Sequence, residues 1–82
     1  MRYRDGQAIH VGDVVRIDVH HQGTVVACIE DGVYLHPHTR EQWTHLRKGV
    51  LIDTSFGGLV HYPDEAALES EPVELSRRGH DL

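Results

Sequence analysis

The stretch VVRIDVHHQGTVVACI, residues 14–29, decides the fold that we expect for this chain. Val15, Ile17 and Val19 alternate with neighbours that are mostly polar, and a period of two is typical of a strand with one buried face. Beyond a glycine, residues 24–29 form the most apolar run of the chain. Their β-branched side chains favour a strand over a helix. The stretch therefore predicts two neighbouring antiparallel strands, of which the second is central to the sheet.

Shorter apolar runs separated by tight turns continue this pattern on both sides. An Asp-Gly pair at 31–32 predicts a hairpin into a strand at 33–36, and a glycine-rich turn at 54–58 joins strands at 50–53 and 59–62. Thr39 and Gln42 fit a capping box, which predicts one or two helical turns over residues 39–46. We therefore expect a mainly β fold, a small SH3-like barrel of five or six antiparallel strands with one short helical turn.

Length and charge divide the chain into a body and a tail. The 82 residues suffice for one domain with a thin core, and we place the barrel in residues 1–62. Residues 63–82 hold six of the 13 acidic residues but only two of the eight basic ones. We expect this acidic C-terminal extension to be partly ordered, with helix-forming residues at 64–69 and an edge strand at 73–75. The negative charge of such an extension attracts basic partners and disfavours the binding of nucleic acid. An acidic tail can also serve solubility alone.

The single cysteine and the absence of long apolar runs indicate a reducing compartment. Cys28 has no second cysteine to pair with, whereas small secreted domains are usually rich in disulfides. No apolar stretch approaches the ~20 residues of a membrane span, and residues 1–6 lack the apolar run of a signal peptide. We expect a cytoplasmic protein in which Cys28, inside the most apolar strand, is a buried and inert thiol rather than a nucleophile.

Eight histidines raise the question of a metal site. His36 and His38 flank Pro37, and residues two apart on a strand point to one face, so that His61 or His45 could add a third ligand. Pro37 interrupts that alternation, and no Cys-x-x-Cys or His-Glu-x-x-His motif accompanies the histidines. The pattern favours exposed histidines and no cofactor, with a metal site as the lesser alternative.

Aromatic and basic residues supply the candidates for partner binding. These candidates are Trp43, Tyr62, Tyr34, Arg40 and Arg47. With Lys48 and Arg16, the two arginines could also form a basic and aromatic face of the kind by which small β-barrels bind nucleic acid. The tryptophan either covers one open end of the barrel or, if exposed, anchors a protein interface.

Two parts of the chain resemble known families. Residues 5–9, 11–15 and 23–26 resemble the opening of small SH3-like barrels, including those related to KOW modules. Residues 43–52 and 57–62 are similar to small bacterial proteins that are often encoded on mobile elements or beside polymorphic toxins. The resemblance spans residues 3–62 and implies a barrel, an immunity-type role and no catalytic activity.

Three functions follow as hypotheses. The first is a non-catalytic protein-binding module, of an immunity or accessory type, that binds a basic partner. The alternative is a nucleic-acid-binding barrel that uses the basic residues. The second alternative is a histidine-based metal-binding protein. Because so small a core gains from a partner surface, a homodimer is compatible with each of them.

Overall fold

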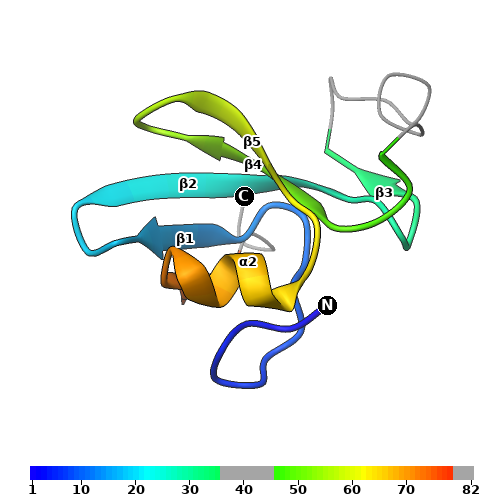
Figure 1. Ribbon diagram of the computed structural model, residues 1–82. Coiled ribbons are helices and arrows are strands. Elements are labelled where there is room, and N and C mark those ends of the chain that lie inside the picture. The colour runs from blue at the N-terminus through cyan, green and yellow to red at the C-terminus, as the bar shows by residue number, and fades with distance from the viewer. Residues whose placement is uncertain (36–45, 79–82) are drawn as a thin grey trace.

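The computed structural model describes residues 1–35 and 46–78. Within these ranges all strand pairs are antiparallel and form one sheet in the order β5-β4-β2-β1-β6, with β3 also paired to β2 (Figure 1). The elements are β1 (Val14–Ile17), β2 (His21–Cys28), β3 (Val33–Tyr34), β4 (Val50–Thr54), β5 (Gly58–Tyr62), α2 (Glu65–Ser70) and β6 (Val73–Arg77). The prediction of a small, mainly β fold of five or six antiparallel strands with one short helix is confirmed. The described helix is α2, whereas the helical turn expected over residues 39–46 lies almost wholly outside the described residues.

Strand β2 is the centre of the sheet, as its apolar sequence predicts. It pairs with β1, β3 and β4, and Val25 and Ala27 are completely buried. Gly23 lies where β2 crosses close to β4, since a Cβ there would stand 2.6 Å from Cγ2 of Ile52. A side chain at this position would push the two central strands apart.

The core lies on both sides of the central strands. The larger cluster is formed by inward-facing side chains of every strand except β3 and by residues of the N-terminal segment and the helix: Tyr3, Ile9, Val15, Ile17, Val25, Cys28, Val50, Ile52, Tyr62, Leu68 and Val73. A smaller cluster contains Val26, Ala27, Ile29 and Leu51, with Tyr34, Leu35 and Leu46 packed against it. The sheet is therefore covered on both faces near β2 and β4.

Helix α2 carries the chain from one edge of the sheet to the other (Figure 1). Asp64 caps it by accepting a hydrogen bond from the main-chain N of Ala67 at 2.9 Å, and Leu68 is buried in the main core. So short a helix is marginal alone, and here the cap and the buried leucine hold it in place. Residues 65–77 thus complete the sheet and the hydrophobic core that the preceding residues begin. The strand expected at 73–75 is present as β6.

Within residues 1–35 and 46–78 we find no helix with the length and apolar character that crossing a membrane requires.

Candidate protein-binding surface

The structure places the predicted partner-binding residues at different sites. Trp43 and Arg40 lie outside the described residues. Tyr62 is not a surface anchor, because its ring is buried in the main core and only 3% of the residue is exposed. Tyr34 is half-buried against the smaller cluster, and Arg47 is exposed in the connection before β4.

The residues predicted for metal binding and for nucleic-acid binding are likewise not gathered into one site, and those that the structure describes have other partners. His36 and His38 lie outside the described residues, while His61 Nε2 stands 2.9 Å from the main-chain O of Lys48. No group of three potential metal ligands occurs among residues 1–35 and 46–78. Arg16 pairs with Glu74 at 3.5 Å on β6, so its charge is partly neutralised.

Three connections of the fold meet at one end of the molecule. They join β1 to β2, β4 to β5 and α2 to β6, and they surround a shallow hollow of about 380 Å³ lined by Asp18, His21, Phe56, Ser70, Glu71 and Pro72. The main-chain N of Asp18 donates to the O of Pro72 at 3.3 Å, which ties two of the connections together. We call these six residues together with Val19 the loop-end surface. A hollow of this size lies at the small end of the range found for ligand sites.

Phe56 stands exposed at the tip of the β4–β5 hairpin. About half of it is open to solvent, with 47% exposed, and its ring centroid lies 4.9 Å from that of His21 at an interplanar angle of 57°. The turn beneath it is fixed, because Thr54 Oγ1 donates to the O of Gly58 at 2.7 Å and accepts from the N of Gly57 at 3.1 Å. The ring is therefore presented on a defined turn, so that binding a partner would cost little ordering entropy.

Val19 projects from the β1–β2 connection in an unfavourable backbone conformation. Its φ is +54° and that of Asp18 is +50°, and the N of His20 donates to the O of Asp18 at 2.6 Å. This i to i+2 hydrogen bond is that of a γ-turn, which is strained when φ is positive. A β-branched residue rarely adopts a positive φ, and Val19 is also 65% exposed. Strain together with an exposed apolar side chain is typical of functional loops.

Two carboxylates give the loop-end surface an acidic border. Asp18 and Glu71 both line the hollow. Glu71 is held in place because its Oε2 accepts a hydrogen bond from the hydroxyl of Tyr62 at 2.6 Å. Burial and this hydrogen bond raise the pKa of Tyr62 above its ordinary value, so the hydroxyl keeps its proton and remains a donor.

A second polar group is buried on the side of the N-terminal loop. Asp13 is fully buried, and its Oδ2 accepts from the hydroxyl of Tyr3 at 2.7 Å, the N of His10 at 3.0 Å and Nη1 of Arg78 at 3.1 Å. Burial, followed by the bond to Asp13, raises the pKa of Tyr3. All three donors bond to Oδ2 of Asp13, and Tyr3, which also lines a hollow beside β6, is only 3% exposed. The cluster therefore joins the two ends of the described chain rather than forming an open site.

The thiol of Cys28 is buried, as the sequence predicts. Its Sγ lies 3.6 Å from the O of Ile9, and burial raises its pKa to about 11. The fold favours the neutral thiol. Its burial therefore contributes fully to the free energy of unfolding below about pH 9, and this contribution is lost as the pH rises toward 11. We expect urea unfolding to show that the free energy of unfolding falls by on the order of 2 kcal/mol between about pH 8 and about pH 11 because of this thiol. The loss should shrink in Cys28→Ala, and an equal loss in both proteins would contradict this origin.

Sequence reasoning missed Phe56 and Val19 as candidate site residues. Phe56 is a large apolar residue inside a segment that otherwise has the composition of a turn. The alternation of Val15, Ile17 and Val19 predicted Val19 on the buried face of a strand, and this prediction is wrong, because β1 ends at Ile17 and Val19 is 65% exposed in the connection that follows. Which turns converge, however, depends on the topology of the sheet. No protein-family model, curated protein or solved structure matches this chain.

Proposed function

We propose that this protein is a non-catalytic protein-binding domain that holds its partner on the loop-end surface. The observation that carries the proposal is the exposed ring of Phe56, presented on a fixed turn beside a hollow that is also lined by Asp18, the chain neighbour of the strained and exposed Val19. Aromatic side chains in such positions are the usual anchors of protein interfaces. No other polar cluster described above combines a hollow with an aromatic residue open to solvent.

The charge of this end favours a basic partner. Asp18 and Glu71 border the hollow, and the adjoining segment contains further acids at 64, 65, 69 and 74. Opposite charge on the partner would speed association and exclude acidic competitors. An immunity-type role, in which the domain neutralises a toxin by occupying a basic face, is one form that this function can take.

The anchor role of Phe56 can be tested with a matched control. Phe56→Ala and Val33→Ala each remove an exposed apolar side chain, 47% and 44% exposed respectively, but Val33 lies on β3, at the opposite end of β2 from His21. A pull-down with the whole chain should recover one protein, and titration calorimetry with that purified protein should follow. We expect Phe56→Ala to raise Kd about 30-fold, as for a buried aromatic anchor, and Val33→Ala to leave it nearly unchanged.

Two results would contradict the proposal. One is an unchanged Kd for a folded Phe56→Ala variant, as judged by circular dichroism. The other is recovery of nucleic acid without protein. The charge argument has its own check: Asp18→Asn, which tolerates the positive φ of this position, should slow association at low salt and have little effect at high salt.

A further inference from the structure

The hollow of the loop-end surface, called the loop-end hollow below, is lined by acidic residues and by no basic one among the described residues. Asp18 and Glu71 belong to its lining, which contains no lysine or arginine. Neither carboxylate forms an ion pair with any residue in the ranges 1–35 and 46–78. The negative charge of this hollow is therefore not offset within the described part of the chain.

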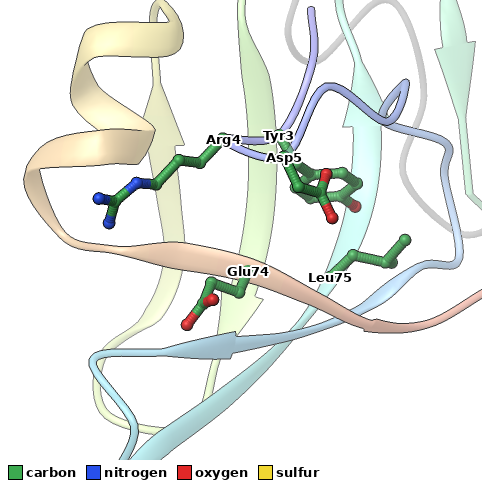
Figure 2. A pocket seen from close by; sticks show the side chains of 5 residues that line it. All are labelled: Tyr3, Arg4, Asp5, Glu74 and Leu75. Atoms are coloured by element: carbon green, nitrogen blue, oxygen red, sulfur yellow. The ribbon is translucent and has the colours of Figure 1, made fainter.

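Two other hollows of similar volume contain charges of both signs. Figure 2 shows the hollow beside β6, of about 350 Å³, in which Arg4 and Asp5 come from the N-terminal loop and Glu74 comes from β6. Glu74 is in turn paired with Arg16 at 3.5 Å, so that the charges around this hollow balance. The other hollow, of about 340 Å³, has one acidic and one basic residue in its lining. Of the three, the loop-end hollow is the one whose charge selects a cation.

An extended organic cation fits the loop-end hollow better than a metal ion. Asp18, His21 and Glu71 all line it, yet no group of three potential metal ligands in residues 1–35 and 46–78 is placed to hold one ion. The two carboxylates belong to different connections, β1–β2 and α2–β6. A cation with several N–H donors spread over a plane can bond to acceptors that are separated in this way.

The ring of Phe56 favours one kind of organic cation over the others. About half of this residue is exposed, it lines the same hollow, and the ring of His21 contacts it at a tilt of 57°. A planar guanidinium stacks on an aromatic face while it donates to carboxylates around it, whereas an ammonium is a compact and strongly hydrated charge. Glu71 is oriented for such a contact, because its Oε2 is held by the hydroxyl of Tyr62 at 2.6 Å.

The occupant comes from another protein rather than from a second copy of this chain. The formal net charge of the chain is −5, so that two copies repel each other. In addition, Arg16 and Arg78 are engaged in ion pairs within the chain. A basic partner supplies an arginine without this repulsion.

We propose that the loop-end hollow binds an arginine side chain of the partner, with its guanidinium stacked on Phe56 and donating hydrogen bonds to Asp18 and Glu71. This contact rests on the proposed function, because it is the central contact of the loop-end surface with its partner. It replaces a general attraction for basic proteins by a requirement for one particular side chain. Arginine is also among the residues that most often dominate the energy of protein interfaces.

The test is an NMR titration of the isotope-labelled whole chain at about pH 8, above the range in which histidines ordinarily carry charge. The probes are three capped tripeptides: Gly-Arg-Gly, Gly-Lys-Gly and the same peptide with citrulline, the uncharged isostere of arginine. Phe56 is the only phenylalanine of the chain, so its ring C–H signals report on the hollow without ambiguity.

We expect the arginine peptide to shift the ring signals of Phe56, and the ring current to move the peptide's own Cδ protons upfield. Its Kd, in the millimolar range, should be about threefold lower than that of the lysine peptide and about tenfold lower than that of the citrulline peptide. The lysine peptide controls for charge alone, and the citrulline peptide controls for shape alone.

Two variants separate the hollow from the general charge of the acidic segment. Glu71→Gln and Glu69→Gln each remove one exposed negative charge from this segment, but Glu69 does not line the hollow. Glu71→Gln should raise the Kd of the arginine peptide about threefold, whereas Glu69→Gln should leave it nearly unchanged. Both variants retain the fold, because both side chains are exposed and glutamine can still accept from the hydroxyl of Tyr62.

Several results would overturn the proposal. They are unchanged Phe56 ring signals at up to about 50 mM arginine peptide, equal affinity for the arginine and citrulline peptides, tighter binding of the lysine peptide, equal effects of the two glutamate variants, and a dimer of the free chain that covers the hollow. If the peptides fail while Phe56→Ala still weakens binding of the captured partner, the loop-end surface binds that partner without an arginine. If Phe56→Ala leaves the Kd of the partner unchanged, the proposed function itself fails, so the two failures are distinguishable.

Discussion

Replacing Gly49 by alanine is expected to lower the free energy of unfolding by about 3 kcal/mol, because the substitution combines two separate costs. The φ of Gly49 is +94°, a conformation that disfavours every L side chain. In addition, a Cβ at this position would collide with the O of Tyr62 and stand 2.8 Å from Cα of Pro63. Both of these are main-chain atoms, which cannot rotate out of the way.

The matched control is Gly58→Ala. The φ of Gly58 is +72°, but a Cβ there would meet nothing within 4 Å. Gly58→Ala should therefore show only the conformational cost of about 1–2 kcal/mol, and the difference between the two variants measures the collision. In thermal unfolding, about 3 kcal/mol corresponds to a decrease in Tm of roughly 12–24 °C for a domain of this size. Equal losses in the two variants would show that the chain does not approach Tyr62 as closely as the structure indicates.

The position of Gly49 explains why this site tolerates no side chain. Its O accepts a hydrogen bond from the N of Ile29 at 2.9 Å, and Val50, the next residue, pairs with both Cys28 and Tyr62. The glycine thus immediately precedes β4, where the strands on either side of β4 converge. An error here would disturb the register of the central and edge strands together.

The regular part of the fold was predictable because local pattern and tertiary structure agree there. Alternation predicted a strand that continues through Val19, and β1 follows it as far as Ile17. The β-branched run after Gly23 predicted the apolar part of β2, and the turns at 31–32 and 54–58 predicted the hairpins into β3 and β5. Each of these features depends on neighbours in sequence. Hairpin pairing then follows with few alternatives.

The parts that could not be predicted depend on contacts between distant residues. The boundary expected at residues 62 and 63 was based on charge, yet Leu68 and Val73 face the core while the acidic side chains around them face solvent. Composition averages over the two faces and hides this difference. Tyr62 is buried for a similar reason, since Glu71 in the following segment supplies an acceptor for its hydroxyl.

The candidate sites show the same division. Phe56 could be placed in a turn from sequence, but the meeting of three connections around it requires the strand order. The place of β6 at the end of the sheet likewise depends on its pairing with β1 instead of β5. Sequence spacing carries no information on which strand ends the sheet.

Replacing Asp13 by alanine is the second change from which we expect a large effect, a loss of about 3–5 kcal/mol in the free energy of unfolding. The carboxylate of Asp13 is fully buried and accepts from Tyr3, His10 and Arg78. All three bonds fall on Oδ2, whereas Oδ1 has no hydrogen-bond partner within the described residues. Alanine would leave the buried hydroxyl of Tyr3 and the partly buried N of His10 without their acceptor, and the guanidinium of Arg78 without its counter-charge.

The contributions to this loss can be separated by smaller changes. Tyr3→Phe removes one donor and should cost about 1–2 kcal/mol. Arg78→Ala should cost more, because it leaves the carboxylate of Asp13 buried with no positive partner, although the 25% exposure of the arginine side chain reduces the effect. Urea unfolding of the single variants and of the double variant Asp13→Ala/Arg78→Ala would give a coupling energy. A double variant much less destabilised than the sum of the singles would show that the ion pair fastens residue 78 to the N-terminal loop, and strict additivity would show that the two side chains act independently.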